Sequence, residues 1–253
     1  MLRKFSLVLF LLAFFSSCNK NQDLKFLYPD SDIIIKHQLD WQKTFYFDRI
    51  NEFENGPIGL NKIVFLGNSI TYGMRNYESV FDVNNIVNRG ISGDYTEGVL
   101  GRLNEIIYYK PIAVFLLIGL NDFFDDNTLR PERTPENIGK NIIRIANTIK
   151  KGSPDSKIYI QTIMPINNKQ YLEDKPYVEF LWPQYNPSIN EQVIQLNNFI
   201  KQNSNFEIID LYPSFVNSSG SMKRNLSRDG VHLNENGYKI WIKQLMPYIN
   251  SLK

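Results

Sequence analysis

Short apolar runs that alternate with helix-length segments constrain the fold of this chain more than any other feature. Five such runs occur: Ile63–Leu66, Ile86–Asn88, Ala113–Ile118, Lys157–Ile163 and Phe206–Leu211. Helix-like segments lie between and after them, near Thr96–Tyr109, Pro135–Lys150, Pro187–Gln202 and Glu235–Tyr248. Continuous apolar strands that alternate with helices predict a parallel sheet covered by helices on both faces.

The segment before the first strand predicts one more helix. Leu39–Phe53 carries aromatic residues close to helical spacing, namely Trp41, Phe45, Tyr46 and Phe53. Because a stripe of this kind is usually buried, we expect these side chains to pack against the main domain. The 253 residues show no repeat and no internal linker, which predicts a single domain over residues 39–253.

The first 38 residues are predicted to lie outside this domain. Arg3 and Lys4 precede the apolar stretch Ser6–Phe15 and then Ser16-Ser17-Cys18, which is the pattern of a secretory signal over residues 1–17. The position of Cys18, the only cysteine, resembles a bacterial lipobox, whose cysteine is lipidated. We therefore expect an exported protein anchored to the bacterial cell envelope, at the outer membrane, through Cys18, with residues 18–38 as a tether and N-terminal arm. The alternative is an ordinary secretory signal that happens to precede a cysteine.

Charge and residue content exclude several classes of function. The formal net charge is +2, and without the signal segment the basic and acidic residues balance. No basic run stands out, which argues against binding to nucleic acid. The chain has two histidines, His37 and His232, and neither an HExxH motif nor a cluster of His and Cys. We therefore expect no metal and no cofactor.

Polar residues form four blocks, three of them directly after predicted strands: Gly67-Asn68-Ser69, Asn88–Asp94, Gly119–Asp122 and, before the last helix, Asp229–His232. Open parallel sheets bind ligands at the carboxyl ends of their strands, so the blocks predict one site. Ser69 has two interpretations at this stage. It could cap the helix that follows, or it could be a nucleophile exposed beside free backbone N–H groups.

In this order, the four blocks resemble those of the SGNH (GDSL-type) hydrolases. That family has a Gly-Asp-Ser corner, a glycine in its second block, a Gly-x-Asn-Asp segment and a C-terminal Asp-x-x-His. The resemblance extends from Lys62 to Tyr248, and the runs NRGISGD and EGVLGRL are most similar to platelet-activating-factor acetylhydrolase-like and bacterial carbohydrate acetylesterases. It implies a three-layer α/β/α flavodoxin-like fold with a five-stranded parallel sheet in the order 2-1-3-4-5.

The chemistry of the blocks leads to a catalytic triad. A serine hydroxyl needs an adjacent base to become a nucleophile at neutral pH. His232 follows Asp229 by three residues, a spacing that lets the carboxylate reach the imidazole and fix its tautomer. We therefore predict a triad of Ser69, His232 and Asp229, although an Asp-x-x-His pair on its own is more often a structural turn.

An acyl-transfer site also needs hydrogen-bond donors for the oxyanion. The family's usual assignment falls on the backbone N–H groups of Ser69 and Gly93 and on the side-chain amide of Asn121. Glycine suits the second position because no Cβ blocks the approach of a substrate. Taken singly, Gly93 would be a turn glycine and Asn121 a helix cap.

Further residues are candidates for substrate binding. Asn68 stands where the family has aspartate; it keeps the hydrogen-bonding shape without the charge, and we predict that activity survives. Asn167–Pro187 is too long for an ordinary strand–helix loop and carries several aromatic residues, which predicts either a substrate wall or a loop that buries its own rings. Asp122 belongs to a small acidic cluster interpreted as a solvated loop. The substrate-binding candidates are Asn68, Asp122, Tyr171, Trp182 and Tyr185.

The sequence thus predicts a serine esterase that hydrolyses a small acyl ester, with an O-acetylated sugar as the expected substrate. A lipase or lysophospholipase of the same family is one alternative. Another is an inactive carbohydrate-binding lipoprotein in which Asn68 marks a first step of decay. Binding of a nucleotide or flavin has little support, because Gly67–Thr71 lacks a P-loop lysine and a dinucleotide fingerprint.

Overall fold

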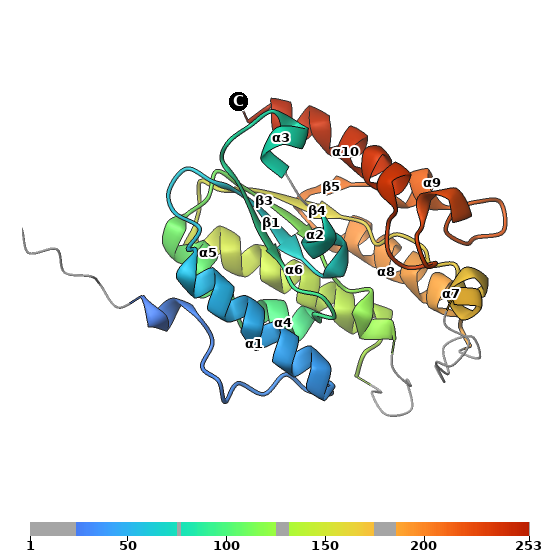
Figure 1. Ribbon diagram of the computed structural model, residues 1–253, viewed down its shortest axis with the longest axis horizontal. Helices are drawn as coiled ribbons and strands as arrows, with labels where there is room; N and C mark the ends of the chain where they lie inside the picture. Colours follow the sequence, from blue (N-terminus) through green and yellow to red (C-terminus); the bar gives the residue numbers. More distant parts are fainter. Residues whose placement is uncertain (1–23, 75–76, 125–131, 175–185, 253) are drawn as a thin grey trace, which may run out of the picture.

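A five-stranded parallel sheet forms the centre of the protein (Figure 1). The computed structural model describes residues 24–74, 77–124, 132–174 and 186–252; the predicted signal segment and Cys18 lie outside these ranges. The strands are β1 (Ile63–Gly67), β2 (Ile86–Gly90), β3 (Ala113–Leu117), β4 (Lys157–Gln161) and β5 (Glu207–Ile209). Their order is β2-β1-β3-β4-β5, as the resemblance implied.

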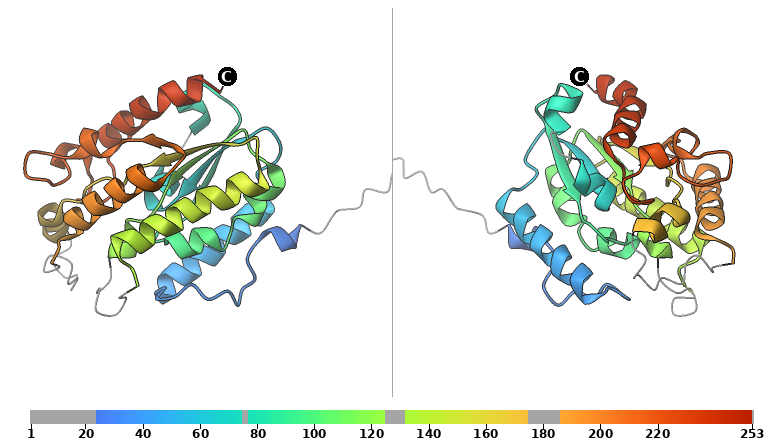
Figure 2. Two further views of the ribbon diagram at one scale, coloured as in Figure 1. Left: turned by 180° about the vertical axis from the view of Figure 1, so that it is seen from behind. Right: turned by 45° about the vertical axis from the view of Figure 1, so that its right-hand side comes forward.

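The two central strands explain why the sheet is covered on both faces. Every residue of β1 and of β3 is buried, so neither strand alternates between apolar and polar residues. On one face, α6 (Pro135–Gly152) and α8 (Ile189–Asn203) pack side by side. The other face carries α10 (Glu235–Asn250) and α3 (Tyr77–Phe81), as Figures 1 and 2 show from several sides. The predicted three-layer fold is confirmed.

The N-terminal helix, α1 (Asp40–Asn55), lies on the outside of the α6 layer beside α4 (Thr96–Leu100). The Tyr46 hydroxyl of α1 donates to the Gly98 carbonyl of α4 at 3.0 Å. A small second core joins α1 to the preceding arm, with the buried residues Leu27, Tyr28, Ile35, Tyr46, Ile50, Phe53, Ile91 and Tyr95. The stripe prediction is wrong for Trp41, which is 55% exposed, because its position in the first turn lies beyond this second core.

The structure differs from the sequence prediction in two segments. Thr96–Tyr109 is two helices, α4 and α5 (Asn104–Tyr109), because the chain turns at Gly101 and directs the Arg102 side chain into the protein. The long loop begins as a helix, α7 (Asn168–Asp174), and residues 175–185 lie outside the described ranges. The remaining elements are α2 (Ser69–Gly73), α9 (Tyr212–Phe215) and the short 3-10 helices η1 (Lys25–Leu27), η2 (Asn121–Phe123) and η4 (Arg224–Leu226). Within the described ranges, no helix has the length and apolarity needed to cross a membrane.

A buried ion pair joins β2 to α5 and to the N-terminal arm. The guanidinium of Arg89 donates twice to the Glu105 carboxylate, each time at 2.8 Å. That carboxylate also accepts from the Tyr28 hydroxyl at 3.0 Å and from the Ile58 backbone N–H at 2.9 Å. The Glu105 side chain on α5 therefore connects β2, the N-terminal arm and the segment that follows α1.

Replacing Glu105 by alanine is expected to lower the free energy of unfolding by about 3–5 kcal/mol, because it leaves the buried Arg89 cation without its counter-ion. Urea unfolding of the purified protein measures this difference. Glu136→Ala is the matched control, since Glu136 and Lys140 form an exposed ion pair on α6 and its loss should cost at most about 1 kcal/mol. Similar losses for both variants would contradict the role of Glu105.

Candidate active site

The end of β1 places Ser69 at the carboxyl edge of the sheet. Gly67 makes the close turn possible, because a Cβ at this position would lie 2.3 Å from the Leu117 carbonyl oxygen. Asn68 then caps α2, with its Oδ1 accepting from the Ile70 backbone N–H at 3.0 Å. Asn68, and not Ser69, is therefore the cap, and the Ser69 hydroxyl is directed elsewhere. The interpretation of Ser69 as a helix cap is wrong.

The hydroxyl of Ser69 meets the imidazole of His232, although 163 positions separate them in the sequence. His232 Nε2 lies 3.1 Å from Ser69 Oγ, and His232 Nδ1 lies 2.8 Å from Asp229 Oδ2. Asp229 is buried, whereas the His232 side chain is 29% exposed. The three side chains thus form a continuous chain from a buried carboxylate to a hydroxyl at the protein surface, the arrangement that activates a serine.

The carboxylate of Asp229 is held in its charged form. Burial acts to raise its pKa, but the hydrogen bond from His232 and the two backbone N–H groups of Val231 and His232 hold the pKa well below its usual range. A charged carboxylate at this distance keeps the proton of the imidazole on Nδ1 and leaves Nε2 as the acceptor facing Ser69.

The loop that carries these two residues is fixed by hydrogen bonds to neighbouring segments. Ser227 Oγ accepts from the Gly230 backbone N–H at 2.7 Å and donates to the His232 carbonyl at 3.0 Å. Asn167, directly before α7, donates its backbone N–H to the Gly230 carbonyl at 2.7 Å. The start of the long loop therefore supports the loop of His232.

Three hydrogen-bond donors, on Ser69, Gly93 and Asn121, follow the carboxyl ends of β1, β2 and β3. Gly93 has φ = +77°, a conformation that favours glycine. Within the described residues, the backbone N–H groups of Ser69 and Gly93 have no protein acceptor. The side-chain amide of Asn121 donates one N–H to the Asp94 carbonyl at 2.9 Å, which leaves its second N–H for another acceptor. Such donors can stabilise an oxyanion.

Gln42, in the first turn of α1, was missed by sequence reasoning. Its Nε2 donates to the Gly93 carbonyl at 3.1 Å, and its Oε1 accepts from the Tyr95 hydroxyl and the Leu39 backbone N–H, each at 2.8 Å. Gln42 therefore holds the Gly93 turn from outside the sheet. No signal in the sequence links a glutamine in a surface helix to a loop about fifty residues away.

The predicted substrate-binding residues lie in different surroundings. Asn68 and Asp122 are both buried; Asn68 lines a small internal cavity together with Ile70. Asp122 accepts from the Thr96 hydroxyl at 2.7 Å and from its backbone N–H, so the interpretation of a solvated acidic loop is wrong for Asp122. Tyr171 is half-buried in α7, with its backbone beside Gly230. Trp182 and Tyr185 lie outside the described residues.

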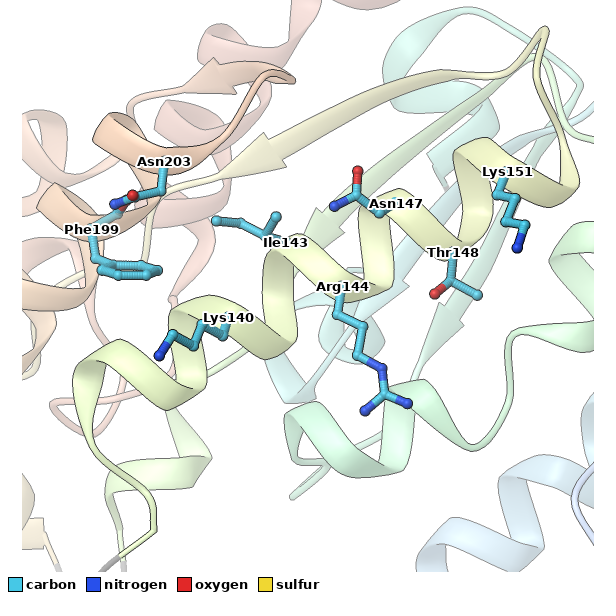
Figure 3. Close-up of a pocket in the computed structure, with 8 residues that line it drawn as sticks. All are labelled: Lys140, Ile143, Arg144, Asn147, Thr148, Lys151, Phe199 and Asn203. Atoms are coloured by element: carbon cyan, nitrogen blue, oxygen red, sulfur yellow. The ribbon is translucent and has the colours of Figure 1, made fainter.

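A separate hollow on the outer surface between α6 and α8 includes none of the predicted site residues (Figure 3). Its lining combines the basic residues Lys140, Arg144 and Lys151 of α6 with apolar surface from Ile143 of α6 and Phe199 of α8. Its lining includes no serine, cysteine or histidine, so the carboxyl edge of the sheet, where Ser69 meets His232, is the candidate active site.

The model of the GDSL-like lipase/acylhydrolase family matches residues 65–240. The chain belongs to this family. A platelet-activating factor acetylhydrolase IB subunit alpha2 from Rattus norvegicus is 26% identical over 199 residues, which cover 75% of this chain and 76% of the rat protein. The family match begins inside β1, so α1 and the arm before it lie outside the matched residues.

Solved structures with the same fold include further hydrolases. A GDSL-like lipase from Bacteroides thetaiotaomicron has a TM-score of 0.63 and 20% identity, covering 82% of this chain and 98% of its own. An acetylxylan esterase from Geobacillus stearothermophilus has a TM-score of 0.56 and 20% identity, covering 76% of this chain and 95% of its own.

Asn121→Ala is expected to lower kcat for ester hydrolysis by about 10²–10³-fold, because an oxyanion donor acts mainly in the transition state. Steady-state kinetics on a chromogenic acetyl ester measure the change, and KM should move much less than kcat. Asn141→Ala is a suitable control, since Asn141 donates to Thr96 on α4 and not to the loop of Gly93. A loss below about tenfold for Asn121→Ala would contradict its assignment.

For this family member, kcat/KM is expected to rise as the pH increases through roughly 6–7, where histidine side chains ordinarily lose their proton. A protonated His232 cannot accept the proton of Ser69. Asp229 remains charged across this range because its pKa lies below the usual value, so one group should account for the whole rise. A pH–rate profile measures it, and a flat profile would exclude His232 as the base.

Proposed function

We propose that this protein is a serine esterase that removes small acyl groups, foremost O-acetyl groups, from carbohydrates. The observation that carries the proposal is the contact of His232 Nε2 with Ser69 Oγ at 3.1 Å, backed by Asp229. Membership of the GDSL-like lipase/acylhydrolase family supports an acyl ester as the substrate.

The reaction proceeds in two steps on these residues. Ser69 Oγ attacks the ester carbonyl while His232 takes its proton, and the negative oxygen is bound by the N–H donors of Ser69, Gly93 and Asn121. His232 then gives the proton to the leaving alcohol, which leaves an acyl group on Ser69. Water, activated by His232, attacks this acyl-enzyme, and the proton returns to Ser69 as the carboxylic acid departs.

A short acyl group is favoured by the cavity beside the nucleophile. This cavity is only about 10 Å³ and is lined by Asn68, Ile70, Leu117, Leu120, Ile163, Met164 and Val231. Ser69 and His232 are not among its lining residues, but Ile70 follows Ser69 directly and Val231 directly precedes His232. Its volume is close to that of one water molecule, which suits a methyl group and not a long acyl chain.

Two similarities support the choice of acetyl esters on carbohydrate. A structural neighbour is an acetylxylan esterase, and a sequence relative is an acetylhydrolase. The lipase alternative requires a long apolar cleft for an acyl chain. The small size of the cavity beside Ser69 argues against it.

The test is a panel of 4-nitrophenyl esters of increasing acyl length together with acetylated oligosaccharides, with released acid measured by mass spectrometry. We expect acetate to be the best acyl group, with kcat/KM falling by at least about tenfold by octanoate. Ser69→Ala should lower the rate by at least about 10³-fold. Ser79→Ala, in α3, is the control for a serine outside the site.

Each alternative predicts a different result. A preference for octanoate would favour the lipase interpretation. A wild-type protein that hydrolyses no ester of the panel, but binds the oligosaccharides, would favour the inactive binding protein. Hydrolysis that persists in Ser69→Ala would exclude Ser69 as the nucleophile.

A further inference from the structure

Trp41 exposes its indole beside the candidate oxyanion donor Gly93. The side chain is 55% exposed, and its outer ring edge faces the Gly93 turn: a Cβ built on Gly93 would lie 2.7 Å from Trp41 Cη2 and 3.1 Å from Cζ3. The N–H of Gly93 points, in the proposed mechanism, at the oxygen of the reacting carbonyl. The ring therefore contacts a residue that would hold the oxygen of the reacting ester.

The indole is separate from the cavity assigned to the acyl group. That cavity is lined by side chains of β3, of α2 and of the loops after β3 and β4 and before His232, and α1 contributes none of them. We assign the acyl group to the cavity and the carbonyl oxygen to Gly93, and on this assignment Trp41 is available to the leaving alcohol. Its position therefore bears on which alcohol the site accepts.

The first turn of α1 is held in place although Trp41 itself is exposed. The next residue, Gln42, is buried and makes three hydrogen bonds, to Gly93, Tyr95 and Leu39. The backbone of Trp41 is thus attached to the same loop that its ring contacts. A ring fixed in this way loses little conformational entropy when a ligand packs on it.

From this placement we propose that Trp41 is the platform for the sugar ring of the leaving alcohol, a specificity determinant supplied by the segment before the family match. The inference rests on the proposed function. A flat indole buries the apolar C–H face of a pyranose ring, while the hydroxyl groups at the rim of that ring remain in water. A small aliphatic alcohol such as ethanol has no such face and gains far less from the contact.

The test compares an acetylated xylo-oligosaccharide with ethyl acetate as substrates of the wild type and of Trp41→Ala, with acetate release as the readout. We expect KM for the saccharide to rise about tenfold, and the preference for saccharide over ethyl acetate in kcat/KM to fall by a similar factor. Trp41→Phe should recover most of the preference, because a planar ring remains.

Binding without turnover gives an independent measurement. In the Ser69→Ala background, calorimetric titration with the same oligosaccharide should show a Kd about tenfold weaker once Trp41→Ala is added. Tyr108→Ala is the matched control: Tyr108 is also an exposed aromatic residue, but it lies in α5 just before β3, at the opposite edge of the sheet. It should leave both the preference and the Kd within about twofold.

The outcomes separate this inference from the function on which it rests. Equal losses for both substrates in Trp41→Ala would mean that Trp41 only supports the Gly93 turn, and an unchanged preference would mean that the sugar does not reach it. Either result overturns the platform and leaves the esterase standing. A wild type that hydrolyses neither ester would overturn the proposed function, and the platform with it.

Discussion

The ion pair between Arg102 and Asp94 is the interaction on which the geometry of the active site depends. Arg102 donates to the Asp94 carboxylate at 2.8 and 3.1 Å. The same guanidinium donates to the Gly67 carbonyl at 3.2 Å and to the Arg89 carbonyl at 2.9 Å. One side chain therefore binds the carboxyl ends of β1 and β2 and the loop that carries Gly93. Both residues are buried, so loss of either partner would leave a charge in the interior.

Asp94 extends this connection to the third strand. Its backbone carbonyl accepts from the Asn121 amide. Asn121 is therefore hydrogen-bonded to the residue that directly follows Gly93, the other proposed donor. Burial raises the pKa of Asp94 to about 6, although Arg102 acts to lower it. A carboxylate in so dry a place is costly unless it is fully paired. The buried ion pair thus fixes the carboxyl ends of three strands relative to one another. Donors held in fixed positions need no reorganisation during the reaction, which favours catalysis.

The parts of this structure that could be predicted are those with a local signal. The apolar runs indicate their strands directly, and the corner at Gly67 places Ser69 at a strand end. The parts that could not be predicted depend on contacts between distant segments. Gln42 is buried because it bonds to a loop about fifty residues away. Trp41, one residue before it, lies outside the second core and is exposed. Asp122 is buried because Thr96 supplies its hydrogen bonds, whereas its neighbours in sequence suggested a solvated loop.

The break between α4 and α5 has the same origin. The local sequence favours one helix over Thr96–Tyr109, but Arg102 reaches the ends of β1 and β2 only if the helix is interrupted near Gly101. The hydrogen bonds of Arg102 to two carbonyls and a carboxylate outweigh the helical turn that is lost, since each bond to a charged group contributes about 1.5–3 kcal/mol. Tertiary contacts of the active site therefore override local helix propensity here.

Asn68 shows how the site tolerates a departure from the Gly-Asp-Ser pattern. The cap on α2 needs one side-chain oxygen that accepts from Ile70, and asparagine and aspartate both supply it at the same position. The charge that aspartate would add is of limited use, because α2 has only five residues and the helix dipole is correspondingly small. Because Asn68 makes the cap, the Ser69 hydroxyl faces His232 instead of the helix end. The substitution therefore alters the charge beside the nucleophile and preserves the geometry that the proposed reaction needs.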